Sequence, residues 1–392
     1  MSRKFAEDAS RVDPGPDAGA GGRARGRGPV TLASPDTRRT ARAIVRSWRE
    51  LTGPGGGAAG GRAARRGGDA GRSTLVACSG GGDSTALAAA LAWAGLGRRI
   101  VLAHVVHDLR PPEESRVDAE AVRRLADRLG VRCVERAVRC AGAKVNAESA
   151  ARRARYRALW EVARAEGFGW IATGHQADDQ LETLVMRLVR GAGPAGLGGV
   201  RAVRDLGGGV RAVRPMLGVT RAEARRLCED AGLGWAEDRT NADTLRARSA
   251  VRHGVLPALE ALDGGSERAA RRAARSAELL ADAAGLVGER AAAVLARAGR
   301  GPAGERVWPR RDLAAERAVV VGETLRLAAW PDGAAGRDAA RVLERAVRAV
   351  REGVDGVRVF EAGGGRVVVR GAEVRAGSKK REARSENEDP PR

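Results

Sequence analysis

The chain is 392 residues long and carries a formal net charge of +21, from 70 Lys and Arg against 49 Asp and Glu. This length exceeds that of a usual single domain and predicts two folded units with disordered ends. The sequence contains no run of about 18 apolar residues and no signal-peptide core, which argues against a membrane span or export and favours a cytoplasmic protein.

The excess of positive charge favours a polyanionic partner, most simply a nucleic acid. Lysine occurs at only four positions, however, while Arg, Ala and Gly are abundant, and this composition is also typical of a GC-biased genome. The four cysteines form no Cys-x-x-Cys pair, and no His/Cys cluster has zinc-ligand spacing. A reducing compartment is therefore expected, and a protein-bound zinc is not.

Residues 1–70 are predicted to be a disordered extension that contains one short helix. Residues 1–36 are rich in Gly, Pro, Arg and Asp without an apolar period, so burial cannot offset the entropy cost of ordering them. Between residues 37 and 51, apolar side chains recur at helical spacing, at Ala41, Ile44, Val45, Trp48 and Leu51. A linker of Gly, Arg and Ala follows at 53–71.

From residue 73 the pattern predicts an α/β domain with a doubly wound parallel sheet, over about 71–245. Short apolar runs alternate with amphipathic segments that are long enough to be crossovers. Strands are expected at 73–78, 99–106, 131–138, 169–174 and 210–215. Helices are expected at 84–94, 115–129, 147–166, 178–190 and 220–231. Ligands of such sheets bind at the carboxyl ends of the strands, where the polar motifs described below fall.

Residues 246–376 are predicted to form a smaller, mainly helical domain. Ala, Leu and Arg repeat there at helical spacing, most clearly over 267–297. Val357 and Val359, and then the valines at 367–369, flank a Gly-rich turn and predict a hairpin near the end. The charged residues 377–392 are expected to be a disordered tail.

The first predicted strand runs into a glycine-rich loop, residues 79–84, and then into a helix. Three successive glycines, Gly80, Gly81 and Gly82, let backbone N–H groups converge on an anion, and the helix start adds a positive dipole. The hydroxyls of Ser79 and Ser84 can donate further hydrogen bonds, while Asp83 is placed to organise the loop or to hold Mg²⁺. A tight turn without a ligand is the alternative, but the order strand, loop and helix favours a phosphate cradle. No Gly-Lys-Ser/Thr follows, so this is not a Walker A loop.

This loop resembles the signature of the PP-loop ATP pyrophosphatase superfamily, whose members split ATP to AMP and pyrophosphate through an adenylated intermediate. Further motifs, with their order and spacing, narrow the resemblance to the tRNA(Ile)-lysidine synthetase family over about 73–260. They lie at 104–110, 148–156, 172–183, 187–191, 214–217 and 237–241. The resemblance implies the adenine nucleotide α-hydrolase-like fold.

The resemblance also implies a ligase that forms a carbon–nitrogen bond. In that family ATP adenylates the C2 oxygen of the wobble cytidine in the CAU anticodon of tRNA(Ile), and pyrophosphate leaves. The ε-amine of L-lysine then displaces AMP to give lysidine. ATP with Mg²⁺, L-lysine and tRNA(Ile) are therefore the expected ligands, and the oligomeric state is left open.

Two acids at the start of the 178–190 helix carry the expected lysine chemistry. Asp179 and Glu182 are three residues apart, so both carboxylates share one face and can hold a cationic lysine or accept its proton. Ordinary capping of a helix N-terminus by acids is the alternative. Asp178 is expected to point elsewhere, towards a metal or the loop.

Asp83 and Arg152 complete the expected catalytic set, and His104 joins residues 79–84 in the nucleotide site. Family position places Arg152 near the phosphate or the adenylated base, with Arg155 and Arg214 as further candidates; each alone is typical of a solvated arginine. His104 and His107 lie three residues apart at the end of the strand predicted at 99–106 and are expected to frame the nucleotide pocket, unless they are structural. The chain departs from the family pattern at Val106, Asp108, Gln176 and Ser249.

Two other functions remain open. A tRNA thiolase would share the scaffold, but its chemistry needs a persulfide-bearing or cluster-binding cysteine pair, which the sequence lacks. A non-catalytic RNA-binding protein could use the glycine-rich loop to grip backbone phosphate. Synthetases that activate carboxylates share the loop but lack the Asp-Asp-Gln-x-Glu context of residues 178–182.

Overall fold

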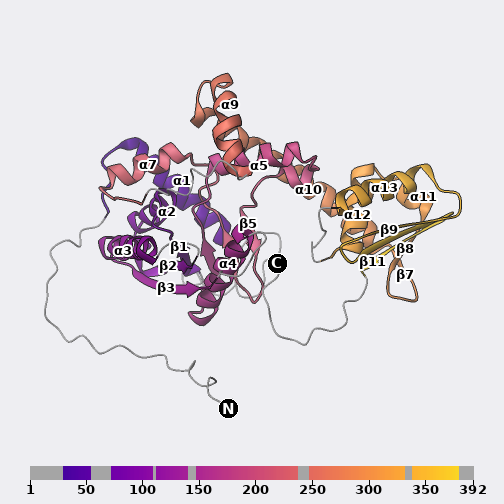
Figure 1. Cartoon of the computed structure of the whole chain (residues 1–392), viewed down its shortest axis with the longest axis horizontal. Coiled ribbons are helices and arrows are strands. Elements are labelled where there is room, and N and C mark those ends of the chain that lie inside the picture. The colour runs from indigo at the N-terminus through magenta and orange to yellow at the C-terminus, as the bar shows by residue number, and fades with distance from the viewer. Residues whose placement is uncertain are drawn as a thin grey trace, which may run out of the picture.

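Two sheets joined by helices organise the chain (Figure 1). The computed structural model describes residues 30–53, 72–108, 112–139, 147–236, 247–331 and 338–378. Residues 1–29 and 379–392, and most of the predicted linker, lie outside these ranges. The prediction that disorder extends to residue 36 is wrong, because Val30 and Leu32 are buried in a hydrophobic core and a helix begins at Pro35. None of the helices within them combines the length and the apolar character needed to cross a bilayer.

The first sheet has six strands in the order β3-β2-β1-β4-β6-β5. They are β1 (Thr74–Ala77), β2 (Ile100–His107), β3 (Arg132–Val138), β4 (Trp170–Ala172), β5 (Val203–Asp205) and β6 (Arg211–Val213). Five of them pair in parallel, which confirms the predicted parallel sheet, whereas β5 pairs antiparallel with β6. The sequence prediction missed β5 because a three-residue strand with one apolar side chain shows no period.

Helices cover both faces of this sheet, as the doubly wound prediction requires. The helices of the first unit are α1 (Pro35–Thr52), α2 (Gly82–Trp93), η3 (Gly97–Arg99), α3 (Pro112–Leu129), α4 (Ala147–Ala165), α5 (Ala177–Val189), α6 (Pro194–Leu197) and α7 (Arg221–Asp230). Val76 and Leu102 face a core shared with α1, α2, α3 and α7, while Leu75 and Val101 face a core shared with α4. This alternation follows from the two-residue period of a strand.

Helix α1 confirms the helix predicted at 37–51 and belongs to the first core. Ser34 caps it by accepting a hydrogen bond from the Asp36 N–H at 3.2 Å. Ile44 and Trp48 are fully buried, and the Trp48 indole N–H donates to Thr74 Oγ1 of β1 at 3.2 Å. The helix is thus fixed to the sheet rather than held by its linker alone.

Replacing Trp48 by Ala is expected to lower the free energy of unfolding by about 3–5 kcal/mol, because it empties a fully buried site. Urea or thermal unfolding measures the change. Arg46→Ala, on the exposed side of the same helix, is the matched control and should change stability by less than about 0.5 kcal/mol. Equal losses in the two variants would contradict the packing of α1 against the sheet.

The second unit combines helices with a five-stranded antiparallel sheet, in the order β7-β8-β11-β10-β9. Its strands are β7 (Gly299–Arg300), β8 (Arg306–Pro309), β9 (Val357–Ala362), β10 (Gly365–Arg370) and β11 (Glu373–Ser378). Its helices are α11 (Arg310–Ala314), α12 (Ala318–Ala329) and α13 (Ala339–Glu352). The predicted hairpin is β9 and β10, but β11 continues to Ser378, so the expected tail at 377 begins too early.

Helix α10 (Ser266–Ala296) links the two units (Figure 1). It packs against α5 and α6 of the first unit and against α12 of the second. Shorter segments precede it: α8 (Ala247–Ala250), the π-helical turn η5 (Val251–Val255) and α9 (Leu256–Leu262). These segments bring two arginines back to the carboxyl edge of the first sheet.

Candidate functional site

The candidate site lies where strand order reverses, between β1 and β4. The chain leaves β1 towards β2 on one side, and β4 lies on the other side of β1. The loops that follow β1 and β4 touch at Gly174, where a Cβ atom would lie 2.9 Å from the carbonyl carbon of Asp83. Glycine is therefore required at this position for the two loops to meet.

The glycine-rich loop has the geometry of an anion site. Gly80 has a φ of +87°, which L side chains rarely adopt. Gly81 caps α2 without any side-chain hydrogen bond, so no capping side chain covers the first N–H groups of the helix. The Ser84 hydroxyl donates to the Gly81 carbonyl at 3.0 Å and accepts from the Ser79 N–H at 3.3 Å, which holds the loop in shape.

Two side chains support this loop from other elements. His104 of β2 is buried, and its Nδ1 lies 2.9 Å from the Cys78 carbonyl at the end of β1. His104 therefore holds the strand end behind the loop, and its contact with a nucleotide stays a prediction. The half-buried Trp235 indole packs against Gly82, and the Ala236 N–H donates to the Gly80 carbonyl at 2.9 Å. The sequence prediction missed Trp235, although it directly precedes the motif at 237–241.

The two acids of α5 lie on one face, as their spacing predicted. Gln176 caps the helix by accepting from the Asp178 N–H at 2.9 Å, and Asp179 Oδ2 accepts from the Gln176 N–H at 2.9 Å. Glu182 is almost fully buried, with 1% of its surface exposed. Asp179 therefore does cap the helix, as the alternative prediction stated. Its other oxygen, Oδ1, nevertheless lies on the same side of the helix as Glu182.

Arginines from distant parts of the chain neutralise these acids. Arg248 of α8 donates to Glu182 Oε2 at 2.5 Å and to Asp179 Oδ1 at 2.6 Å. Arg252 of η5 donates to Glu182 Oε1 at 2.6 Å, and Arg221 of α7 lies 3.8 Å from the same oxygen. These contacts were not predicted from the sequence, although the spacing of four residues between Arg248 and Arg252 is typical of one helical face.

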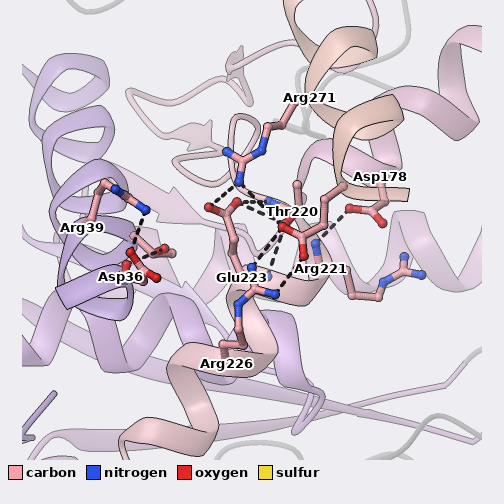
Figure 2. A network of polar contacts seen from close by, with 10 residues as sticks. Asp36, Arg39, Asp178, Thr220, Arg221, Glu223, Arg226 and Arg271 are labelled. Atoms are coloured by element: carbon pink, nitrogen blue, oxygen red, sulfur yellow. Dashed lines mark hydrogen bonds and ion pairs between the residues drawn. The ribbon is translucent and has the colours of Figure 1, made fainter. Parts of the chain in front are cut away.

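Two further carboxylates lie beside this network. Burial raises the pKa of Asp83 to about 6; Arg221 opposes the shift, and the carboxylates of Asp179 and Asp178 add to it. Asp178 does point away from Asp179, because its Oδ2 accepts from the Arg221 N–H at 2.9 Å (Figure 2). Burial also raises the pKa of Asp178. Asp178 thereby ties the start of α5 to the start of α7.

A cationic lobe borders the acids on the α4 side. Arg214 is 3% exposed, donates to the Arg201 carbonyl at 2.6 Å and to the Tyr156 hydroxyl at 3.3 Å, and its Nε has no hydrogen-bond partner within the described residues. The Arg152 guanidinium lies over the Tyr156 ring, 5.4 Å from its centre. Arg214 and Arg152 thus meet at Tyr156 of α4.

His175 lies within the lobe and is neutral at physiological pH. Burial lowers its pKa to about 3, and the charges of Arg214, Arg152, Arg248 and Arg155 lower it further. Its Nδ1 lies 2.8 Å from the Thr173 hydroxyl. The charges of Arg152 and Arg155 thus act on this ring, whereas their roles in catalysis stay a prediction.

The sequence departures have ordinary places in the structure. Gln176 is fully buried as the cap of α5; its amide lowers the pKa of Asp83 slightly but has no well-aligned hydrogen-bond partner among the described residues. Val106 and Ser249 are half-buried, and Asp108 is exposed. The side chains of His107 and Glu148, and the motif at 237–241, lie outside the described residues.

Comparison with known proteins gives a family match. The family described as "PP-loop domain" matches residues 62–259, half of the chain. Three curated relatives named tRNA(Ile)-lysidine synthase are similar. That of Salinispora tropica is 46% identical over 188 residues, covering 47% of this chain and 56% of that protein. That of Methylobacterium nodulans is 41% identical, covering 51% and 58%. That of Streptomyces coelicolor is 41% identical, covering 53% and 59%.

The chain thus matches little more than half the length of these relatives. Among solved structures, the U34-tRNA thiolase NcsA from Methanococcus maripaludis with its 4Fe-4S cluster is 17% identical, with a TM-score of 0.45. The alignment covers 62% of this chain and 78% of that one.

Proposed function

The chain belongs to the PP-loop domain family, and from this membership we propose that it is an ATP-dependent ligase that attaches L-lysine to C2 of the wobble cytidine in the CAU anticodon of tRNA(Ile). One observation carries the proposal: an uncapped phosphate loop and the acid pair Asp179 and Glu182 lie at the same sheet edge. The names of the curated relatives support the same reaction.

The proposed first step uses the loop and the cationic lobe. The triphosphate of ATP binds the N–H groups at 79–84 and the start of α2. The C2 oxygen of the cytidine attacks the α-phosphorus, the bond to the β-phosphate oxygen breaks, and pyrophosphate leaves while the loop still holds it. Arg152 and Arg214 supply the charge that stabilises the crowded phosphates. Asp83 is the described carboxylate that fits a nucleotide-bound Mg²⁺, which would neutralise the leaving pyrophosphate.

The proposed second step uses the acid pair. The ε-amine of lysine attacks C2, and the bond from C2 to the adenylate oxygen breaks with loss of AMP. Asp179 and Glu182 hold the incoming ammonium group and accept the proton that it must lose. The carboxylate oxygens already receive bonds from Arg248 and Arg252, but each can accept more than one hydrogen bond, so the substrate shares them with these guanidinium groups.

The cysteine environments argue against the thiolase alternative. Burial raises the pKa of Cys133 to about 11 and that of Cys228 to about 12, and also raises the pKa of Cys78. These three cysteines are therefore thiols at neutral pH, whereas sulfur transfer needs a thiolate.

Purified protein is expected to transfer labelled lysine to tRNA(Ile) with a CAU anticodon, forming one AMP and one pyrophosphate for each lysine attached. The measurement is the label in precipitated RNA together with nucleotide analysis. A tRNA with an altered wobble base is the control and should receive no lysine. Formation of ADP, or RNA without lysine from folded protein, would contradict the proposal. If the wild type shows no turnover and the Asp83→Ala variant still binds RNA, the non-catalytic alternative is favoured.

A further inference from the structure

Helix α1 carries a row of arginines on its outward side. Arg39, Arg42, Arg46 and Arg49 are three, four and three residues apart, and all four are exposed. The opposite side of the helix, with Ile44 and Trp48, is buried against the first sheet. These four residues, called the α1 arginine face below, extend over about 15 Å at 1.5 Å per residue.

Most of this face is free of acidic partners within the described residues. Arg39 pairs with Asp36 at 2.7 Å, but both side chains are more than 70% exposed, so the pair is weak. Arg42, Arg46 and Arg49 form no ion pair with any described residue. Three arginines of α10 differ, since Arg271, Arg272 and Arg275 each pair with an acid.

Helix α3 shows that this charge is not general to helices of the first sheet. It is as long as α1 and packs on the same core, yet it carries five acids and four arginines. Helix α1 carries five arginines and two acids. An arginine-rich composition alone would enrich both helices alike, so the excess on α1 is local.

The N-terminal end of the α1 arginine face lies next to the candidate site. Arg39 lines a cleft of about 330 Å³ together with Glu223, Arg226 and Arg271 (Figure 2). Glu223 belongs to the capping box at the start of α7. In the same turn, the Arg221 N–H donates a hydrogen bond to Asp178 of the candidate site. The row of arginines therefore starts at the border of the site and leads away from it.

The sequence continues the positive charge on both sides of α1. Residues 21–29 contain three arginines and no acid. Residues 54–71 contain three arginines and one acid.

We propose that the α1 arginine face binds the phosphate backbone of the RNA substrate, outside the anticodon bases that enter the site. The inference rests on the proposed function for the identity of the RNA. Guanidinium groups match phosphate oxygens in a bidentate manner, and such contacts position RNA without reading its sequence. An anionic membrane is the poorer fit, because α1 exposes no large apolar side chain that could enter a bilayer.

The test compares two triple variants of the full chain. Arg42→Gln, Arg46→Gln and Arg49→Gln remove three charges from α1. Arg116→Gln, Arg124→Gln and Arg128→Gln remove three charges from α3 and form the matched control. The Kd for tRNA(Ile) is measured by fluorescence anisotropy between 50 and 300 mM KCl, a range of about sixfold in salt over which phosphate contacts weaken strongly. Circular dichroism checks that both variants fold.

The α1 variant is expected to bind tRNA about tenfold or more weakly, and the slope of log K against log salt should fall by roughly two to three. The α3 variant should keep a slope near that of the wild type. An unchanged slope in the α1 variant, or an equal loss in both variants, overturns the inference. So does a loss confined to binding of phosphatidylglycerol vesicles. Lysine attachment by the wild type is measured separately, so a failure of the proposed function is distinguishable.

Discussion

Replacing Asp83 by Asn is expected to reduce AMP and pyrophosphate formation by on the order of a hundredfold or more, and to make the protein more stable above pH 6. The carboxylate belongs to the phosphate loop and feels the charges of Asp179 and Asp178, and burial raises its pKa to about 6. Asn has the same shape and no charge, so it removes both the Mg²⁺ ligand and the electrostatic penalty.

The direction of the stability change follows from the pKa shift. The folded-state pKa of Asp83 lies above its ordinary value of 3.8, so folding favours the protonated form. Relative to Asn, the wild type should be equally stable near pH 4 and should lose about 2–3 kcal/mol as the pH rises through 6. Unfolding of both proteins at pH 4, 6 and 8 measures this difference.

Asp127→Asn is the matched control, since Asp127 is exposed on α3. It should leave turnover unchanged and stability within about 0.5 kcal/mol at every pH. A less stable Asp83→Asn protein at pH 8 would show that the carboxylate is stabilising where it lies. Wild-type turnover should itself rise with pH through about 6, because only the ionised carboxylate can hold the metal.

Replacing Glu182 by Ala is expected to lower the free energy of unfolding by about 3 kcal/mol and to abolish lysine attachment. Removal of one member of a buried ion pair leaves its partners desolvated without compensation. Here Arg248 and Arg252 each lose a carboxylate acceptor, although Arg248 keeps its bond to Asp179. The value is at the low end of the usual range because these side chains are 38% and 21% exposed and remain partly hydrated.

Chemical unfolding and the lysine-attachment assay together measure this effect. Glu161→Ala is the control, because it breaks the exposed pair of Glu161 with Arg157 and should change stability by less than about 1 kcal/mol. The double variant Glu182→Ala with Arg252→Ala should recover part of the lost stability, since it removes one stranded charge. Full stability of Glu182→Ala alone would mean that water replaces the carboxylate without penalty.

The sequence predicted the first sheet well, because its signals are local. Each element is a local run: the strands at 73–78 and 99–106 are apolar, and the helix predicted between them, at 84–94, is continuous. The structure places these elements within a few residues of the prediction. The five-stranded sheet was predicted only as a hairpin, because β7 and β8 are short and Trp308 of β8 pairs with Val374 of β11 across a long intervening segment. Pairing at such separation leaves no trace in a local period.

The candidate site shows the same division. The loop at 79–84 and the spacing of Asp179 and Glu182 could be read directly, since each depends on neighbouring residues. The choice of Arg248 and Arg252 as partners could not, because they are 66 and 70 residues from Glu182 and the chain offers 70 cationic side chains. Which cation meets a buried acid is decided by the whole fold.

Helix α10 has a mechanical consequence for the two units that it joins. Ala277 and Ala281 pack against the segment around Gly198 and Gly199, while Ala291 lies in the second core. Between these anchors, Gly285 and Gly288 have no neighbouring atoms within reach of a Cβ, and glycine stiffens a helix least. Flexing of the long helix is therefore easiest over these few residues, so the units can tilt relative to each other while both interiors stay intact.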